Sequence, residues 1–556
     1  MIATEEDENK TSEHKPEDKI QNTNWQIRLP LLIFLSLGVG IWLGAMLFGG
    51  IRSQSAQANY QKIKEILGYI DQEYVDTVKI DELVDFSIEQ LLEKLDPHTS
   101  YIAAKNIQLA HSQLEGDFEG VGIEFNIVRD TVHIAAIIPG GPSEKEGLQA
   151  GDKIIKVDDK NIASIKIDNA QIFKLLRGKK GTKVKLSVLR KGKKQLMHYT
   201  VTRNTITSPS VEVSFMVDAQ TGFIKITRFA SNTYKEFREA LEKLQAQGMQ
   251  RLIIDLRDNP GGYMDRAINI ADELLAGSVK IVYTDGKGSK YDSEHKAHIQ
   301  GMMEKGAVIV LINEGSASAS EILAGALQDN DRALIVGRRS FGKGLVQMPI
   351  ALSDGSELRL TISRYYTPSG RSIQKPFTKD KKDAYENEIL ERYKRGEYFS
   401  ADSIKFDKSL QYTTAKGRKV YGGGGIMPDV FVSFDSSAIQ RYLNDLYRDD
   451  IIREVALSYY ATYKAELANM KYENFKTNFN LPKVWIEEVL KRAQQGKIAT
   501  NGLTSSELEK DIQIHLKAWI ARSVWQSRGF YPIWFEQDEI FQKALKLFDK
   551  AEKLLL

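Results

Sequence analysis

The stretch VIVLINEGSASASEILAGALQD, residues 308–329, contains a strand signal, a turn and a helix signal in immediate succession. The run Val308–Ile312 is apolar throughout, which indicates a buried strand. Small polar residues then lead into an apolar pattern of helical spacing, so a helix is predicted to begin near Ser318. A serine at such a turn lies beside the free N–H groups of the first helical turn, which can stabilise an oxyanion. The stretch therefore predicts a strand–helix unit with a candidate nucleophile at its turn.

A lysine in a glycine-rich stretch follows this serine by 25 residues. Lys343 lies in SFGKGLVQ, residues 340–347, just after a second apolar run. A serine hydroxyl needs a base to take its proton, and a lysine can serve where burial favours its neutral amine. The nearest carboxylates in the sequence are those of Asp331 and Asp354, and neither lies within ten residues of the lysine. No local anion would hold the amine charged, so Ser318 and Lys343 fit a serine–lysine hydrolase.

Simpler interpretations of these residues stay open. Ser318 and Glu321 together fit a capping box, in which the serine only caps the helix. A lysine between glycines is commonly a solvated loop residue, and Ser316 and Ser320 compete with Ser318 as the nucleophile. A histidine base is less suitable than lysine, because no histidine occurs within residues 299–514 and a triad would need distant residues.

Further motifs occur along the chain. They are LDPHTSY at 95–101, DLRDNPGG at 255–262, GSASASE at 315–321 with ALQD at 326–329, SFGKGLVQ at 340–347, and GGGGIMPD at 422–429. Each is weak alone, but the set resembles the C-terminal processing peptidases, which are tail-specific serine–lysine proteases with a PDZ domain. The resemblance covers roughly residues 60–435. YYTPSGR at 365–371 also resembles a stretch of that family, although no chemistry is assigned to it.

The resemblance implies roles for individual residues. Ser318 alone keeps the 25-residue step of the family to Lys343, so these two residues become nucleophile and base. Gln347, four residues after the lysine, would orient it; otherwise it is an ordinary polar residue of a strand. The backbone N–H groups of Gly262 and Ala319 would form the oxyanion hole. The histidine of LDPHTSY lies in a structural turn in the family, which favours a structural role here as well.

Residues 116–205 have the composition of several short strands and resemble a PDZ domain. The phrase GLQAGDKII at 147–155 is typical of that family. Residues 120–123 match the loop that binds a peptide carboxylate through backbone N–H groups, and the peptide would add as a strand to the sheet edge. The substrate-binding residues predicted from this match are Gly120, Val121, Gly122, Ile123 and Phe125, of which Ile123 and Phe125 would line an apolar pocket. The alternative is a plain hairpin with a glycine turn.

The N-terminal part predicts a tail and an anchor. Residues 1–28 are polar, and we expect a cytoplasmic tail. Residues 29–51 contain no charge and are long enough to cross a bilayer, so they predict a transmembrane anchor. The alternative is a signal peptide cleaved near Ala56. With the resemblance, this predicts a single-pass protein of the inner (cytoplasmic) membrane whose catalytic part is periplasmic.

The remaining segments complete a multidomain α+β architecture. Residues 56–115 predict a helical region. Residues 206–435 alternate strands and helices and resemble the crotonase/ClpP-like βα superhelical core of serine–lysine peptidases. They include a charged insert, 376–418, of unassigned function. Residues 436–556 predict a helical domain, in which four tryptophans indicate a packed bundle or a docking surface for an adaptor or a second copy.

Composition excludes several classes of function. The chain of 556 residues has no cysteine, which rules out disulfides and thiol catalysis, and a net charge of +3 points to no nucleic-acid partner. We therefore expect a membrane-anchored endopeptidase, without metal or cofactor, that acts on exported proteins with apolar free C-termini. The alternatives are an inactive PDZ scaffold or tail-binding chaperone, and a hydratase or acyl-CoA enzyme on the same core.

Overall fold

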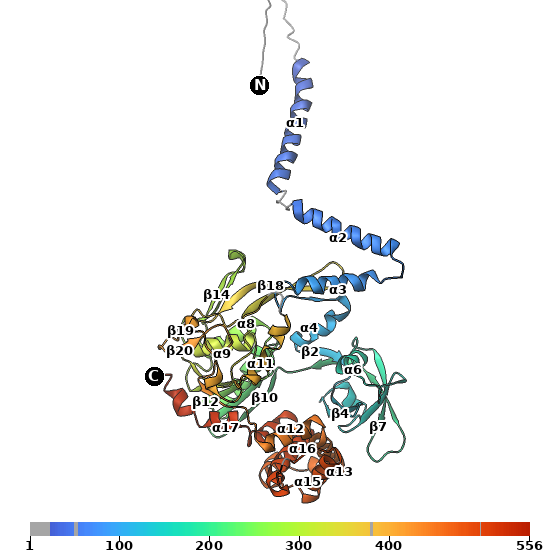
Figure 1. Ribbon diagram of the computed structural model, residues 1–556, viewed down its shortest axis with the longest axis vertical. Coiled ribbons are helices and arrows are strands. Elements are labelled where there is room, and N and C mark those ends of the chain that lie inside the picture. Colours follow the sequence, from blue (N-terminus) through green and yellow to red (C-terminus); the bar gives the residue numbers. More distant parts are fainter. Residues whose placement is uncertain (1–22, 49–53, 139, 379–381, 501) are drawn as a thin grey trace, which may run out of the picture. The chain divides into compact units, whose positions relative to one another are not determined.

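The computed structural model describes residues 23–48, 54–138, 140–378, 382–500 and 502–556 (Figure 1). They belong to two units, Met1–Phe86 and Ser87–Leu556. The first unit holds the helices α1 (Thr23–Phe48) and α2 (Gln54–Glu73) and the start of α3 (Ile80–Leu92). Most of the polar tail predicted at 1–28 lies outside the described residues.

The membrane anchor predicted at 29–51 is wrong, and so is the inner-membrane location that depends on it. In the part of the chain that the structure describes, no helix combines the length and the apolar character that crossing a membrane requires.

Residues 116–205 form a small β-domain, drawn in cyan and teal in Figure 1. Its main sheet has the strand order β3-β4-β5-β7-β8, with β6 paired to β5, and β2 pairs with β9. The elements are β2 (Asp117–Gly120), β3 (Ile123–Val128), β4 (Thr131–Ile137), α5 (Pro142–Lys145), β5 (Lys153–Val157), β6 (Lys160–Asn161), α6 (Asn169–Leu176), β7 (Lys183–Leu189), β8 (Met197–Thr202) and β9 (Asn204–Thr207). Because β3 is the last strand of the main sheet, its outer edge has no neighbouring strand in that sheet.

The core of the second unit is a sheet of six strands in the order β10-β11-β12-β15-β16-β21, parallel from β11 onward. Its strands are β10 (Val211–Met216), β11 (Thr221–Ile226), β12 (Arg251–Asp255), β15 (Val308–Ile312), β16 (Ala333–Gly337) and β21 (Val430–Phe431). The helices that accompany it are α7 (Thr233–Gln245), α8 (Met264–Asp272) and α9 (Ala319–Asp329). The predicted βα alternation is present in this sheet.

Strand β15 contains no polar residue because both of its faces are buried. Val310 packs in one hydrophobic cluster with residues of α7, α8 and α9. Ile309 and Leu311 pack in a second cluster on the opposite face. Parallel strands that are covered on both faces have continuous apolar sequences rather than alternating ones. The buried strand β15 leads directly into the turn that carries Ser318, so the packing of the strand fixes the position of the turn.

A second sheet, in which every strand pair is antiparallel, carries further residues of the predicted site. Its order is β1-β18-β13-β14, with β17 paired to β18. The strands are β1 (Ser100–Ile102), β13 (Lys280–Gly286), β14 (Ser293–Lys296), β17 (Leu345–Ala351) and β18 (Glu357–Tyr366). Strand β17 begins two residues after Lys343, so the predicted base lies in the loop that connects the two sheets.

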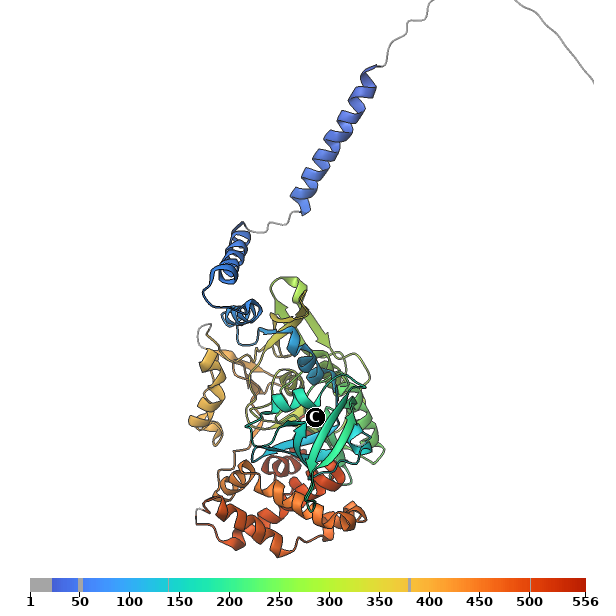
Figure 2. The same ribbon diagram turned by 90° about the vertical axis from the view of Figure 1, so that its right-hand side faces the viewer.

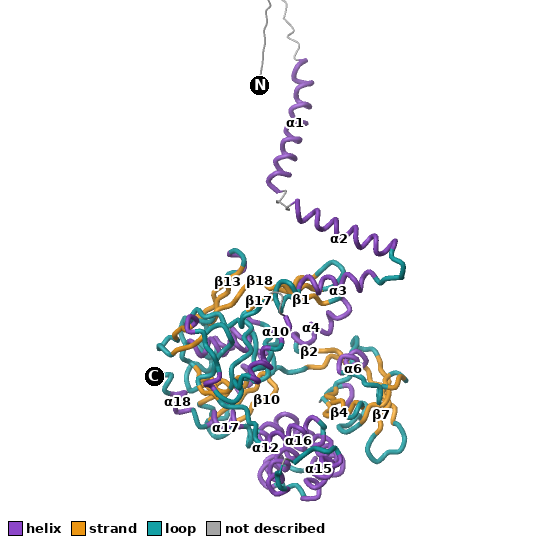
Figure 3. Tube along the Cα trace, viewed as in Figure 1, coloured by secondary structure: helices purple, strands orange, loops and turns teal. Residues whose placement is uncertain are grey.

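The C-terminal region consists mostly of helices, whereas the insert contains short helices joined by loops (Figures 2 and 3). The insert holds α10 (Lys382–Glu386), α11 (Glu388–Lys394) and β19 (Gln411–Thr413), which pairs with β20 (Lys419–Tyr421) just after the insert. The C-terminal helices are α12 (Ala438–Arg448), α13 (Ile451–Ala468), α14 (Tyr472–Asn478), α15 (Lys483–Gln495), α16 (Ser505–Trp534), α17 (Glu539–Leu545) and α18 (Phe548–Glu552). Helices α12 to α16 share a hydrophobic cluster, against which the four tryptophans pack. Residues of α17 and α18 instead pack against the core sheet.

The motif YYTPSGR has a structural role. Arg371 and Asp329 form an ion pair of 2.7 Å in which both side chains are completely buried. Arg371 also donates to Gln328 Oε1 at 2.8 Å and to the carbonyl oxygen of Tyr421 at 2.9 Å. The pair joins the C-terminal end of α9 to the chain that follows β18.

We expect Arg371→Met to destabilise the core by about 3–5 kcal/mol, because Asp329 would keep a buried charge without its cation. Hydrogen–deuterium exchange of the peptide 319–329 in the full chain measures this as lost protection of α9. Arg364→Met is the matched control, since Arg364 is exposed on β18. Equal protection in the two variants would contradict a stabilising role for the pair.

Candidate active site

Ser318 is the N-cap residue of α9 and has a strained backbone, with φ 56° and ψ −114°. Non-glycine residues seldom adopt a positive φ, and such strain is common where a side chain is held for function. Ser316 and Ser320 are buried, and their hydroxyls donate to the carbonyl oxygens of Leu256 (2.8 Å) and Asn259 (2.9 Å). Of the three competing serines, only Ser318 is partly exposed.

The loop after β12 lies directly against this turn. The N–H of Ala317 donates to the carbonyl oxygen of Asn259 at 2.9 Å. A Cβ atom on Gly261, whose φ is +98°, would lie 2.7 Å from Ser318 Cβ and 3.0 Å from the nitrogen of Ala319. Any larger residue at position 261 would collide with the serine turn. The motif DLRDNPGG therefore brings a backbone segment into contact with the predicted nucleophile.

The structure places the two predicted oxyanion donors on these adjoining segments. Ala319 is the first residue of α9, so its N–H has no acceptor within the helix. Gly262 follows Gly261 in the adjoining loop and has a φ of +140°. The amides on either side of Gly262 are already used: Gly261 donates to Asn259 Oδ1, and Tyr263 donates to the carbonyl oxygen of Phe229.

Lys343 is half-buried in the loop between β16 and β17. Burial lowers the pKa of Lys343 below its ordinary value of 10.5. The carboxylates of Glu321 and Asp96 act in the opposite direction on this pKa, while the guanidinium of Arg359 adds to the lowering. The folded chain thus brings two carboxylates near the lysine although none is near in the sequence, and burial outweighs them.

Glu321 links the serine turn to the lysine loop. Its completely buried carboxylate accepts hydrogen bonds from the N–H of Ser318 (2.9 Å) and the hydroxyl of Ser340 (2.5 Å). It also accepts from the N–H of Gly342 (2.7 Å) and of Lys343 (2.9 Å). Burial raises the pKa of Glu321, while the four donors act to lower it.

Sequence reasoning found the helix-capping contact of Glu321 but missed its bonds to the lysine loop. A signal was present: α9 is apolar or small-residue on nearly all sides, so a carboxylate in its first turn had to be buried. A buried carboxylate requires several donors.

A second residue that the sequence analysis missed is Tyr365. Its hydroxyl lies 3.2 Å from the carbonyl oxygen of Ser318 and 2.5 Å from that of Lys343. Tyr365 is buried, and burial raises its pKa well above the ordinary value of 10.0. It therefore keeps its proton and links the same two segments as Glu321.

Gln347 lies on β17, and its Nε2 donates to Thr361 Oγ1 at 3.1 Å. Thr361 Oγ1 in turn donates to Asp96 Oδ1 at 3.1 Å. Gln347 is therefore connected to one of the carboxylates that act on Lys343.

His98 lies in a turn, and its Nε2 is 2.7 Å from the hydroxyl of Tyr385. Burial, with a contribution from Lys343, lowers the pKa of His98 to about 4. The ring is neutral at pH 7 and helps to pack the lysine region.

The predicted peptide-binding residues surround one end of β3. The carbonyl oxygens of Val121 and Gly122 accept from the N–H groups of Ser143 (3.1 Å) and Ile138 (3.1 Å), which fixes the loop. Gly122 has a φ of +76°. Phe125 on β3 contacts Phe173 of α6 edge-to-face, with ring centroids 5.3 Å apart. The arrangement leaves the edge strand β3 beside α6, where a peptide can add to the sheet.

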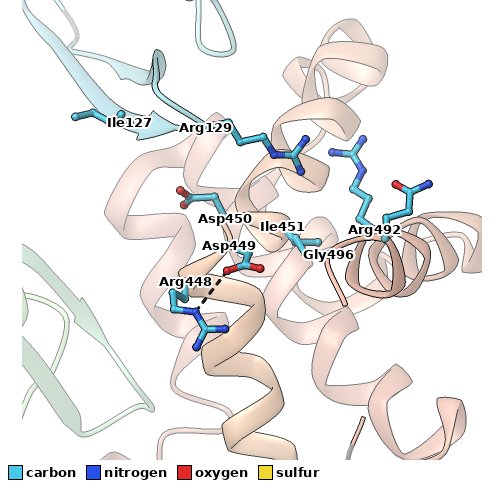
Figure 4. Close-up of a pocket in the computed structure, with 9 residues that line it drawn as sticks. Ile127, Arg129, Arg448, Asp449, Asp450, Ile451, Arg492 and Gly496 are labelled. Atoms are coloured by element: carbon cyan, nitrogen blue, oxygen red, sulfur yellow. Dashed lines mark ion pairs between the residues drawn. The ribbon is translucent and has the colours of Figure 1, made fainter. Parts of the chain in front are cut away.

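A hollow of about 570 Å³ lies apart from these residues (Figure 4). Arg129, Arg448 and Arg492 line it, and each is paired. Glu454 lies 3.5 Å from Arg129 and 2.9 Å from Arg492, and Arg448 is 3.4 Å from Asp449. The hollow is a place where the charged turn after β3 meets α12, α13 and α15. Within the described ranges, no group of three or more His, Asp or Glu side chains is placed to hold a metal ion.

The fold and site define a protease core joined to a peptide-binding domain, and comparison with known families agrees. The model of peptidase family S41 matches residues 220–382, and that of the PDZ domain matches residues 120–201. A family of unknown function matches residues 442–526. The chain belongs to peptidase family S41 and is a serine protease.

Curated relatives make the class more specific. The carboxy-terminal-processing protease of Bartonella bacilliformis is 34% identical over 345 residues, which cover 60% of this chain and 78% of that protein. The carboxyl-terminal-processing protease of Synechocystis sp. is 37% identical over 295 residues, covering 52% and 68%. The carboxy-terminal processing protease CtpA of Bacillus subtilis is 33% identical over 331 residues, covering 59% and 70%. The predicted membership of the C-terminal processing peptidases is confirmed, which argues against the hydratase and acyl-CoA alternatives.

We expect Glu321→Gln to lower kcat/KM for protein cleavage at least tenfold. The amide would present its NH₂ group to N–H or O–H donors that now meet a carboxylate oxygen, and unpaired buried donors are costly. Circular dichroism establishes that the variant is folded. Glu391→Gln is the control, because Glu391 makes an exposed ion pair with Lys394. A kcat/KM within twofold of wild type would show that the link is dispensable.

Proposed function

We propose that the protein is an endopeptidase in which Ser318 is the nucleophile and Lys343 the general base, and that it selects substrates by their C-terminal tails. The observation that carries the proposal is the double link between the two segments. Glu321 accepts N–H groups from both Ser318 and Lys343, and the Tyr365 hydroxyl contacts the carbonyl oxygens of both.

The chemistry follows from this arrangement. Lys343 in its neutral form takes the proton of the Ser318 hydroxyl as the oxygen attacks the scissile carbonyl carbon. The N–H groups of Gly262 and Ala319 stabilise the oxyanion. Lys343 then gives the proton to the leaving amine, and water hydrolyses the acyl-enzyme with the same lysine as base. Gln347 acts on the lysine indirectly, through Thr361 and Asp96.

Tail recognition belongs to the PDZ domain. The free carboxylate of a substrate binds the backbone N–H groups of the loop 120–123, and the tail adds as a strand beside β3. The apolar side chain at the end of the tail packs near Ile123 and Phe125. An adaptor or a second copy at the C-terminal helices stays a prediction from the sequence.

Activity should rise with pH. Burial lowers the pKa of Lys343, and only the neutral amine can accept the serine proton. We therefore expect kcat/KM to increase as the pH passes upward through this lowered pKa and to level off above it. A profile that is flat from neutral to alkaline pH would exclude Lys343 as the base.

Ser318→Ala and Lys343→Ala should each reduce kcat at least a thousandfold. The exposed changes Ser409→Ala and Lys419→Ala are the controls and should leave kcat unaltered.

Substrate choice should depend on a free tail. For an unstructured protein that ends in an apolar residue, we expect C-terminal amidation to lower kcat/KM at least tenfold. Gly122→Ala should remove most of this preference, because its Cβ would lie 3.1 Å from Ile206 Cδ1 and from Pro142 Cδ in the loop. Gly147→Ala is a close control: its φ of +82° is similar, and a Cβ there would meet no atom within 4 Å. Equal cleavage of the free and amidated proteins would refute tail recognition.

A further inference from the structure

The insert 376–418 contacts the loop of the proposed base. Arg392, on α11, is 1% exposed. Its Nη1 donates to the carbonyl oxygen of Ser340 at 2.6 Å, and its Nη2 donates to that of Phe341 at 2.9 Å. Its Nε donates to Glu388 Oε1 at 2.7 Å, one helical turn earlier. One guanidinium thus holds two consecutive carbonyls just before Lys343.

The carbonyls of Gly342 and Lys343 in this loop also accept hydrogen bonds from fixed donors. The N–H of Lys375 donates to the carbonyl oxygen of Gly342 at 2.9 Å, and the Tyr365 hydroxyl contacts that of Lys343. On the opposite side, the N–H groups of Gly342 and Lys343 point to the Glu321 carboxylate. The peptide group between Phe341 and Gly342 therefore meets the buried Glu321 carboxylate through its N–H and the buried Arg392 guanidinium through its carbonyl. Hydrogen bonds to charged groups are the strong ones.

Arg392 and the backbone carbonyls that it holds form a clamp on the lysine loop, and the residues around Arg392 are themselves held in place. Glu388 lies 3.5 Å from the ammonium of Lys375 and 3.7 Å from the guanidinium of Arg339. The Lys375 ammonium lies 4.1 Å from the ring centroids of both Phe341 and Tyr385 and donates to the carbonyl oxygen of Tyr385 at 3.0 Å. These contacts attach α10 and α11 to the segment around Lys375 that precedes them and to the lysine loop.

We infer that Arg392 is a positioning residue for the protease reaction: through the carbonyls of Ser340 and Phe341 it holds the Lys343 loop in its buried geometry. The inference rests on the proposed role of Lys343 as the base. Arg392 bonds to the backbone just before Lys343 and acts through that backbone. Helix α11 of the insert therefore contributes to positioning the proposed base Lys343.

The test compares Arg392→Met with Lys394→Met. Both residues are cations of α11, but Lys394 lies in an exposed pair with Glu391. We expect Arg392→Met to lower kcat at least tenfold with KM changed less than about twofold. Without the contacts of Arg392 with the carbonyls of Ser340 and Phe341, water can reach Lys343, and this loss of burial raises its pKa. The pH at half-maximal kcat/KM should consequently move upward. Lys394→Met should match wild type in all three quantities.

Arg392→Lys provides a second measurement, which decides the matter if circular dichroism shows that the methionine variant is unfolded. It keeps the charge but loses the planar fork that holds two carbonyls. We expect a smaller fall in kcat and a smaller upward shift of the half-maximal pH. A fall in kcat without any shift of that pH would indicate a merely structural role and would overturn the inference.

Lys343→Ala separates this inference from the proposed function. If Lys343→Ala is inactive while Arg392→Met behaves like Lys394→Met, the serine–lysine mechanism stands and the positioning role fails. If Lys343→Ala retains activity, the proposed base is wrong and the positioning role fails with it.

Discussion

The proposed active site depends on one buried carboxylate, that of Glu321. Glu321 is completely buried, and four hydrogen bonds converge on it from the serine turn and the lysine loop. A carboxylate in the protein interior is costly unless such donors surround it. The same donors are therefore needed for Glu321 to be buried and for Ser318 and Lys343 to be held on facing segments. The hydrogen bonds to Glu321 therefore both stabilise the buried carboxylate and hold Ser318 and Lys343 in place.

The Glu321 carboxylate is also one of several constraints on the turn that carries Ser318. The strained φ of Ser318 persists because the helix start, the loop at Gly261 and Glu321 all constrain the turn. Gly261 permits the close approach, since any side chain there would displace the serine. The apolar sheet beneath supplies a rigid base, because β15 is packed on both faces. The turn is thus determined by packing from below and by hydrogen bonds from both sides.

Local patterns predicted much of this arrangement. Features that depend on neighbouring residues can be predicted from the sequence. They include the strand and helix around Ser318, the glycine loop at Gly261 and Gly262, and the strands of the PDZ domain. The contacts of Glu321, Tyr365 and Arg392 with the lysine loop join segments 19 to 52 residues apart, and no periodicity encodes them. The anchor prediction failed for the opposite reason: absence of charge over 29–51 is a local signal, and it does not by itself establish a spanning helix.

The order of the lysine loop and the proposed role of Lys343 place opposing demands on this residue. The Glu321 carboxylate that orders the loop favours the charged form of Lys343, whereas the proposed reaction requires the neutral form. Burial resolves the conflict because its effect on the pKa is the larger one. Burial in turn requires a loop that stays closed, and its carbonyls are held by Arg392 from the side opposite Glu321. An anion alone would order the loop at the expense of the base. Glu321 and Arg392 meet at the peptide group between Phe341 and Gly342, whose N–H donates to the carboxylate and whose carbonyl accepts from the guanidinium.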